Sequence, residues 1–312
     1  MSENPEIVVI GSLNADLVQN VDRLPRPGET IIGGNLQTFS GGKGANQAYA
    51  AGRMGAQVSM VGQVGTDGLA SLLLQSLQSA GVHTGSVGEA DLSTGAAVIL
   101  VLPDGENLIV VSPGANATVT PALAAQRLSA LREGSYLLSQ LEIPIESVDE
   151  SLAVAKARGA TTILDPAPAR ELSPELLRKV DFLTPNETET QTLLGEPGLK
   201  MESDADLELA AKAILALGPR SVVLKLGARG CMIASVQGSH RVPGFKVSAV
   251  DTTAAGDVFN GAFATALAEG RRVPEAARFA NAAAALSVTR PGAQNSVPSR
   301  QEAERFLSEA AD

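Results

Sequence analysis

Residues 250–262 read Val-Asp-Thr-Thr-Ala-Ala-Gly-Asp-Val-Phe-Asn-Gly-Ala, and an apolar stretch typical of a buried helix follows them. Small residues just before a helix leave backbone N–H groups open at its N-terminus, where the partial positive charge suits a phosphate or a developing oxyanion. Asp257 falls in the first turn of this helix. It either caps the helix or accepts the proton of an attacking hydroxyl while the N–H groups hold a phosphoryl group.

A second glycine-rich stretch lies near the N-terminus, where residues 40–48 read Ser-Gly-Gly-Lys-Gly-Ala-Asn-Gln-Ala. It is not a Walker A loop, because Gly44 follows Lys43 where that loop has Ser or Thr. Glycines allow a ligand to approach the backbone closely. Lys43 and Asn46 are three residues apart and would share one helical face. The plain alternative is a tight turn that leads into a helix with a solvated lysine.

A polar pair follows the first apolar strand, residues 6–10, which ends at Gly11. Asn14 and Asp16 are two residues apart, so in an extended segment their side chains point to the same side. Open α/β sheets bind ligands at the carboxyl ends of their strands. An amide beside a carboxylate suits adjacent sugar hydroxyls, whereas the commoner interpretation is an ordinary polar loop.

Two further stretches are weaker on their own. Residues 183–189 read Leu-Thr-Pro-Asn-Glu-Thr-Glu, in which Asn186 is either a helix N-cap or, with Glu189, a neighbour of nucleotide phosphates and their magnesium, usually through water. Residues 225–230, Lys-Leu-Gly-Ala-Arg-Gly, form a glycine turn between two expected strands. Alone, that turn indicates only a hairpin.

Periodicity predicts an α/β fold, in which short apolar strands alternate with amphipathic helices. This alternation implies a three-layer α/β/α sandwich with a mostly parallel central sheet. We expect residues 1–312 to form one domain. Segments 14–39 and 95–112 break the pattern, and we expect them to pair as a small projecting sheet. The expected strands are 6–10, 57–61, 96–102, 107–112, 135–138, 161–165, 181–184, 220–226 and 230–236, and the expected helices are 44–54, 68–80, 121–132, 146–158, 203–217, 256–269 and 274–288.

Composition excludes several functional classes. The 312 residues carry a formal net charge of −10, which is unfavourable for binding nucleic acid or an anionic membrane surface. One cysteine and two histidines leave little material for disulfides, a zinc cluster or a Ser-His-Asp site. The sequence has no apparent secretory signal and no apolar run long enough to span a membrane. We therefore expect a cytoplasmic protein.

Taken in order, these stretches resemble the ribokinase family of carbohydrate kinases over essentially the whole chain. The two specific signatures are Gly-Gly-Lys-Gly-Ala-Asn at 41–46 and Asp-Thr-Thr-Ala-Ala-Gly-Asp at 251–257. Many family members have Gly where Ala254 stands, and the Ala-Ala-Gly-Asp form resembles the branch that phosphorylates ribose. The resemblance implies a transferase of carbohydrate metabolism that uses ATP and Mg²⁺ and is affected by a monovalent cation, which we expect to be K⁺.

The resemblance also implies a role for each matching residue. Asp257 is the expected general base, and the backbone N–H groups of Ala254, Ala255 and Gly256 are the expected anion hole. The implied sugar-binding set, which includes Asp257, is Asn14, Asp16, Gly42, Lys43, Asn46 and Glu142. The implied nucleotide-binding set is Asn186, Glu189, Lys225, Gly227, Gly256 and Asn281. The implied monovalent-cation loops contain Asp251, Thr253, Ser287, Arg290, Gly292 and Ser296, mostly as backbone carbonyl ligands.

The choice of substrate rests on fewer residues. Asn14 with Asp16 suits the 2- and 3-hydroxyls of D-ribose, which would be phosphorylated at its 5-hydroxyl. Deoxyribokinase, fructokinase, nucleoside kinase and a non-catalytic sensor on the same fold remain alternatives. A Rossmann-type oxidoreductase is disfavoured because no Gly-x-Gly-x-x-Gly run follows Gly11. We expect segments 14–39 and 95–112 to form a lid over the sugar and to pair with a second copy as a homodimer.

Overall fold

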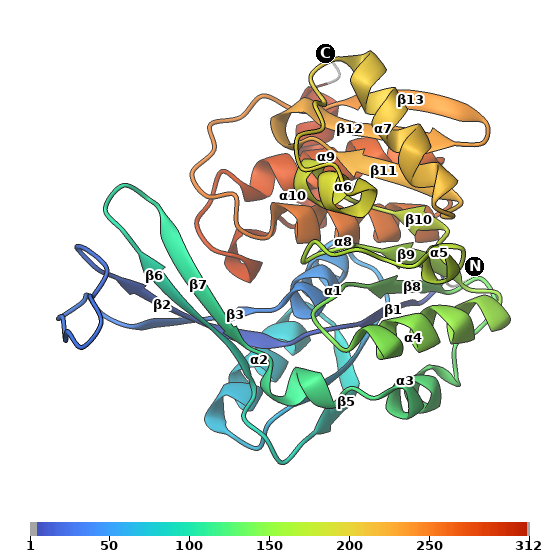
Figure 1. The fold of residues 1–312 in the computed structure, drawn as a ribbon. Helices are drawn as coiled ribbons and strands as arrows, with labels where there is room; N and C mark the ends of the chain where they lie inside the picture. Colours follow the sequence, from blue (N-terminus) through green and yellow to red (C-terminus); the bar gives the residue numbers. More distant parts are fainter. Residues whose placement is uncertain (1–4, 311–312) are drawn as a thin grey trace.

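The computed structural model describes residues 5–310, in which a nine-stranded sheet lies between two layers of helices (Figure 1). The strand order is β13-β12-β11-β10-β9-β8-β1-β4-β5, parallel except for the antiparallel β11–β12 and β12–β13 pairs. This confirms the expected three-layer, mostly parallel architecture. The strands are β1 Ile7–Ile10, β4 Val58–Val64, β5 His83–Glu89, β8 Tyr136–Ser139, β9 Thr161–Leu164, β10 Phe182–Leu183, β11 Ser221–Lys225, β12 Gly230–Ser235 and β13 Gly238–Pro243.

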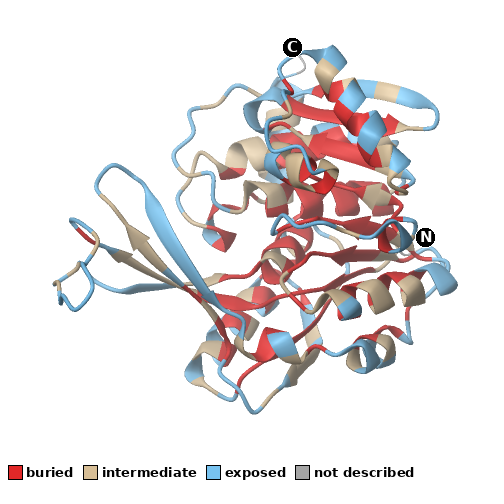
Figure 2. Ribbon diagram, viewed as in Figure 1, coloured by how far each residue is buried: buried red, intermediate tan, exposed pale blue. Residues whose placement is uncertain are grey.

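Side chains of β1 alternate between the two helical layers, because successive residues of a strand point to opposite faces. Ile7 and Val9 pack in one core and Val8 and Ile10 in the other. Figure 2 shows the sheet buried and the outer helical faces exposed. The first core is covered by α1 Lys43–Arg53, α2 Gly68–Ser79, α8 Ala255–Ala268, α9 Val273–Ser287 and α10 Arg300–Glu309. The second is covered by α3 Pro121–Leu128, α4 Ile145–Ala157, α5 Pro174–Leu177, α6 Glu187–Leu194 and α7 Asp204–Ala216.

A second sheet of four strands projects from the side of the main body (Figure 1). Its order is β3-β2-β6-β7, with β2 at Asn14–Asn20, β3 at Gln37–Gly41, β6 at Gly95–Val101 and β7 at Asn107–Ser112. The two off-pattern segments of the sequence therefore pair as expected. Strand β2 follows β1 after a three-residue connection, so the small sheet begins where β1 ends.

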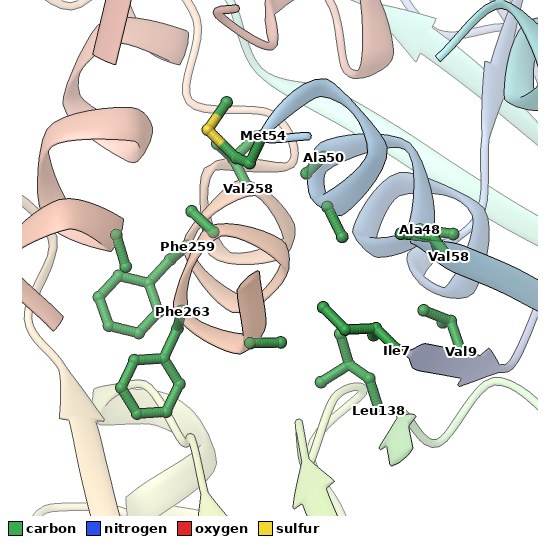
Figure 3. Packing of buried hydrophobic residues seen from close by; sticks show 14 of the residues in the cluster. Ile7, Val9, Ala48, Ala50, Met54, Val58, Leu138, Val258, Phe259 and Phe263 are labelled. Carbon is green, nitrogen blue, oxygen red and sulfur yellow. The ribbon is translucent and has the colours of Figure 1, made fainter. Parts of the chain in front are cut away.

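Helices α1 and α8 lie against each other in the first core and bring their N-terminal turns together. A Cβ atom at Gly261 of α8 would lie 2.6 Å from the carbonyl oxygen of Gln47 and 2.7 Å from the Cβ of Ala50, both in α1. Only glycine permits this approach. Figure 3 shows Met54 of α1 and Val258 and Phe259 of α8 in the surrounding apolar cluster.

Several elements were not expected from the sequence. Strand β5 reads His-Thr-Gly-Ser-Val-Gly-Glu, and β13, at the edge of the sheet, reads Gly-Ser-His-Arg-Val-Pro. Neither sequence alternates apolar and polar residues. Helix α10 buries only Ala303 fully, and its apolar stripe is short, consisting of Ala303, Phe306 and Leu307. Helix α3 ends at Leu128, short of the expected 132. None of the helices in the described chain has both the length and the apolar character to cross a membrane.

Candidate active site

The candidate site lies where the main sheet, the small sheet and the N-termini of α1 and α8 meet. Asp257 sits in the first turn of α8 and its side chain is buried, with only 5% of the residue exposed. Its Oδ2 accepts a hydrogen bond of 3.1 Å from Nδ2 of Asn46, and its Oδ1 accepts one of 2.9 Å from Nε2 of Gln47. A carboxylate has about four lone-pair positions. The two amides therefore orient the group and leave it able to accept a further proton.

Burial raises the pKa of Asp257 to about 6, even though the positive charge of Lys43 and the two amide donors act in the opposite direction. The nearby Asp165 carboxylate adds to the increase. A base is most effective when its pKa lies near the working pH. Asp257 is therefore better suited to proton transfer than an exposed aspartate, whose pKa lies near 3.8.

Lys43, the first residue of α1, is the cationic member of the expected sugar-binding set. Burial lowers its pKa, but Asp257, Asp165 and Glu142 together outweigh burial, and the net pKa lies above the ordinary lysine value. Lys43 therefore stays protonated at neutral pH and offsets part of the negative charge around Asp257.

The other candidate sugar residues surround the same point. Gly42 caps α1 with φ of 87°, and Oε2 of Glu142 accepts bonds from the Ser12 hydroxyl, at 2.5 Å, and from the backbone N–H of Lys43, at 3.0 Å. Oδ1 of Asn14 accepts a bond of 2.7 Å from the Asn116 amide. Burial, with repulsion from Glu142 and Asp257, raises the pKa of Asp16 to about 6. The set expected from the sequence is thus brought together.

A cavity of about 650 Å³ opens beside Asp257, which is one of its lining residues. Lys43, Asp165 and Lys225 line its charged end, while Phe245 and Val247 belong to its apolar wall. This volume lies in the usual range for small-molecule sites. All of the expected nucleotide residues line it, namely Asn186, Glu189, Lys225, Gly227, Gly256 and Asn281.

Asn186 is the N-cap of α6, and it also lines the cavity. Its Oδ1 accepts a bond of 2.8 Å from the backbone N–H of Glu189, and Oε2 of Glu189 accepts one of 2.7 Å from the backbone N–H of Asn186, so the pair forms a capping box for α6. Both side chains also line the cavity. Burial raises the pKa of Glu189, although Lys225 opposes the change. Because the Glu189 oxygens already accept hydrogen bonds, a metal beside them fits best through water.

Helix α8 begins with strained backbone. Ala254, its N-cap, has φ of 58°, the only positive φ at a non-glycine position between residues 5 and 310. This conformation turns the chain so that α8 points its N-terminus into the cavity. The N–H of Ala255 already donates to the carbonyl of Thr252 at 3.2 Å. Within the described chain, the N–H groups of Ala254 and Gly256 have no protein acceptor.

The two expected cation loops lie side by side. Asp251 joins them, because its Oδ1 accepts from the N–H of Thr253 at 2.9 Å and its Oδ2 from the N–H of Gly292 at 2.8 Å. The Ser287 and Ser296 hydroxyls donate to backbone carbonyls, which leaves their oxygens able to coordinate. Arg290 forms a 2.6 Å ion pair with Glu302. Across residues 5–310 no cluster of three or more His, Cys, Asp or Glu side chains could hold a metal, so a cation here would need carbonyl and hydroxyl ligands.

Sequence reasoning missed several residues that hold the site together. Gln47 contacts Asp257 directly, and Asp165, just after β9, pairs with Lys225 at 2.8 Å. The Gln294 amide donates to Oδ1 of Asn46 at 3.2 Å. Asp165 follows the carboxyl end of a parallel strand, the same signal that pointed to Asn14, and could have been found in that way.

Comparison with known proteins agrees with this geometry. A model of the pfkB family of carbohydrate kinases matches residues 4–300. The chain belongs to this family. It is 43% identical over 302 residues to the ribokinase of Bacillus subtilis and 41% identical over 305 residues to that of Haemophilus influenzae, in each case covering 97% of this chain and 99% of the relative. The structure of Arabidopsis thaliana ribokinase complexed with ribose and ATP matches with a TM-score of 0.88 at 33% identity, over 98% of this chain and 99% of that one.

Proposed function

We infer that this chain transfers the γ-phosphoryl group of ATP to the 5-hydroxyl of D-ribose, giving ribose 5-phosphate and ADP. The observation that carries the proposal is that Asp257 lies among the expected sugar residues and also lines the nucleotide-sized cavity. Its carboxylate accepts a hydrogen bond from Asn46 of α1 and lies near Asp16 of β2, polar groups that suit sugar hydroxyls. The similarity to ribokinases, one of them complexed with ribose and ATP, supports this choice of substrates.

In the proposed reaction, Asp257 accepts the proton of the 5-hydroxyl as the sugar oxygen bonds to the γ-phosphorus. The bond from that phosphorus to the β–γ bridging oxygen breaks, and ADP leaves with the bonding electrons. Phosphoryl transfer of this kind depends mainly on positioning and on stabilising charge on the transferring oxygens. The N–H groups of Ala254 and Gly256, a weaker contribution from Ala255, and the ammonium of Lys225 supply that stabilisation.

Residues of the site are suited to hold a magnesium ion and a monovalent cation. Asn186 and Glu189 would hold Mg²⁺ through water beside the phosphates, where the ion would supply charge neutralisation. The carboxyl groups of Asp165, Glu189 and Asp257 line this cavity and are available to attract a cation. The loops joined by Asp251 would hold K⁺ through the carbonyl and hydroxyl oxygens of Thr253, Ser287, Arg290, Gly292 and Ser296.

We propose that the small sheet acts as a lid over the sugar and as a dimer interface. Strand β7 is exposed along its whole length and lies at a sheet edge. Val110 is 69% exposed and Ile109 54%. An exposed apolar edge strand tends to pair with another chain. Light scattering at working concentration should give twice the mass of one chain, and Val110→Lys should reduce it, whereas a monomeric wild-type protein would contradict the proposal.

A coupled ADP-release assay with Mg-ATP tests the activity. D-ribose, 2-deoxyribose, fructose and adenosine are compared, with and without K⁺. We expect ribose to support the highest kcat/KM and K⁺ to increase it. Preference for another sugar would keep the kinase chemistry and refute the assignment to ribose. Failure of every sugar, from protein that still binds ATP, would refute the kinase.

A further inference from the structure

Gln47 makes an unusual set of contacts for a side chain that is fully buried. Its single Nε2 donates to two carboxylates, Oδ1 of Asp257 and Oδ2 of Asp165, each at 2.9 Å. Its Oε1 accepts a bond of 2.6 Å from Nε2 of Gln140. Both hydrogens of the amide and its oxygen are therefore engaged.

These contacts fix the direction of the amide. Rotating the Gln47 amide by 180° would point its oxygen at two carboxylates and its nitrogen at the Gln140 donor. Buried groups with unmatched donors and acceptors cost about 1–3 kcal/mol each. The observed orientation is the one in which both carboxylates receive a donor.

The contacts continue beyond Asp165 to the nucleotide cavity. Oδ1 of Asp165 accepts from Nζ of Lys225 at 2.8 Å, and Lys225 lines the cavity. A Cβ placed on Gly256 would lie 3.4 Å from this Nζ, so Lys225 stands beside the N-terminus of α8. A continuous row of hydrogen bonds thus runs from Lys225 through Asp165 and Gln47 to Asp257.

We propose that Gln47 is a positioning residue that fixes Asp257 for proton transfer and holds it beside the Asp165 carboxylate. The proposal rests on the kinase function inferred above. Two carboxylates that share one buried site tend to keep a proton, because like charges oppose ionisation. The Gln47 amide counters this tendency by donating to both. Without it, Asp257 would be protonated more often and less well oriented.

The two sides of the amide should respond in opposite directions. The charged groups that face Asp257 are Lys43 of α1, Asp16 of β2, Asp165 after β9 and Lys225 of β11. Losing the Gln47 donor removes stabilisation of the charged base, so the pKa of Asp257 should rise. Removing the Asp165 charge removes its repulsion of Asp257 and leaves Lys225 without its carboxylate partner, so the pKa of Asp257 should fall.

The test uses Gln47→Met and Asp165→Asn in the full-length protein, with kcat and kcat/KM for ribose measured from pH 5 to 8. A hydrogen bond to a charged group contributes about 1.5–3 kcal/mol, so we expect Gln47→Met to lower kcat about 10- to 100-fold. Its acidic limb should move to higher pH, and the KM for ribose should change less than about threefold. Asp165→Asn should move the acidic limb to lower pH.

Gln63→Met is the matched control, because Gln63 is a buried glutamine of β4 whose amide makes no hydrogen bond to the site. We expect it to leave the pH profile unchanged. An unchanged profile in Gln47→Met, or displacement of both test variants in the same direction, would overturn the proposal. If circular dichroism shows that Gln47→Met does not fold, the test rests on Asp165→Asn. An acidic limb that stays at the wild-type pH or moves to higher pH in that variant refutes the proposal. Wild-type turnover of ribose is measured first, so a failed kinase assignment is distinguished from a failed role for Gln47.

Discussion

Substituting Gly256 by alanine should separate stability from activity. Gly256 is the second residue of α8, and its Cβ would meet only the Lys225 Nζ, at 3.4 Å, an ordinary van der Waals distance. Alanine is favoured over glycine in a helix by about 0.5–1 kcal/mol. The Gly256→Ala variant should therefore fold and be as stable as the wild type or slightly more stable.

The new methyl group would nevertheless stand in the space that the proposal gives to the transferring phosphoryl group. It would lie 3.4 Å from the Lys225 Nζ, on the residue whose own N–H group is open. Losing one donor of an oxyanion site typically lowers kcat by about 10²- to 10³-fold. We expect a loss of that size in the ADP-release assay, together with an unchanged or raised melting temperature.

Gly68→Ala serves as the control for this experiment. Gly68 is the first residue of α2, and a Cβ there would meet no atom within 4 Å. The Gly68→Ala variant should gain a similar amount of stability and keep full activity. If Gly256→Ala retains kcat within about threefold of the wild type, the N-terminus of α8 is not the phosphoryl site.

Three further predictions follow from the same contacts. Because Asp257 and Asp16 each have a pKa of about 6 and must be ionised to accept hydrogen bonds from the sugar, kcat/KM for ribose should fall as pH drops below about 6, and a profile flat to pH 5 would contradict this. Ala254→Gly should relieve a left-handed conformation that costs about 1–2 kcal/mol. Glycine also gains entropy in the unfolded chain, so the free energy of unfolding should rise by only up to about 1 kcal/mol, with activity kept. Denaturant titration measures this change, and a destabilised variant would show that Ala254 is not strained. Gly261→Ala should force α1 and α8 apart, which should lower the free energy of unfolding by about 1–3 kcal/mol and reduce kcat. A variant with wild-type stability would show that the two helices can accommodate the added methyl group.

The fold was largely predictable because its strands are short apolar runs separated by amphipathic helices. The small sheet was found from two segments that broke this pattern, and its strands β2 and β6 pair directly. Strands β5 and β13 could not be found, since their sequences are mostly polar or glycine and lack an apolar alternation.

The site was predictable where a residue belongs to a recognisable motif, as Asn46 and Asp257 do. Gln47 lies next to Asn46, yet nothing in the local sequence reveals that its side chain turns towards Asp165. That contact depends on the close approach of α1 to α8 at Gly261 and on the end of β9. Tertiary contacts of this kind join residues that are far apart in the sequence, and periodicity carries no information about them.

The most direct test of the proposed mechanism is the rate of a single turnover with Asp257→Asn. Wild-type and variant enzyme are mixed in excess over ribose with saturating Mg-ATP, and ribose 5-phosphate is followed by quenched flow, with ribose binding measured separately by calorimetry. Asparagine keeps the shape of the side chain and removes the base. General-base catalysis typically contributes 10²–10⁴-fold, so we expect the chemical step to slow by about that factor while ribose still binds. A single-turnover rate within about tenfold of the wild type would contradict the role of Asp257 as the base.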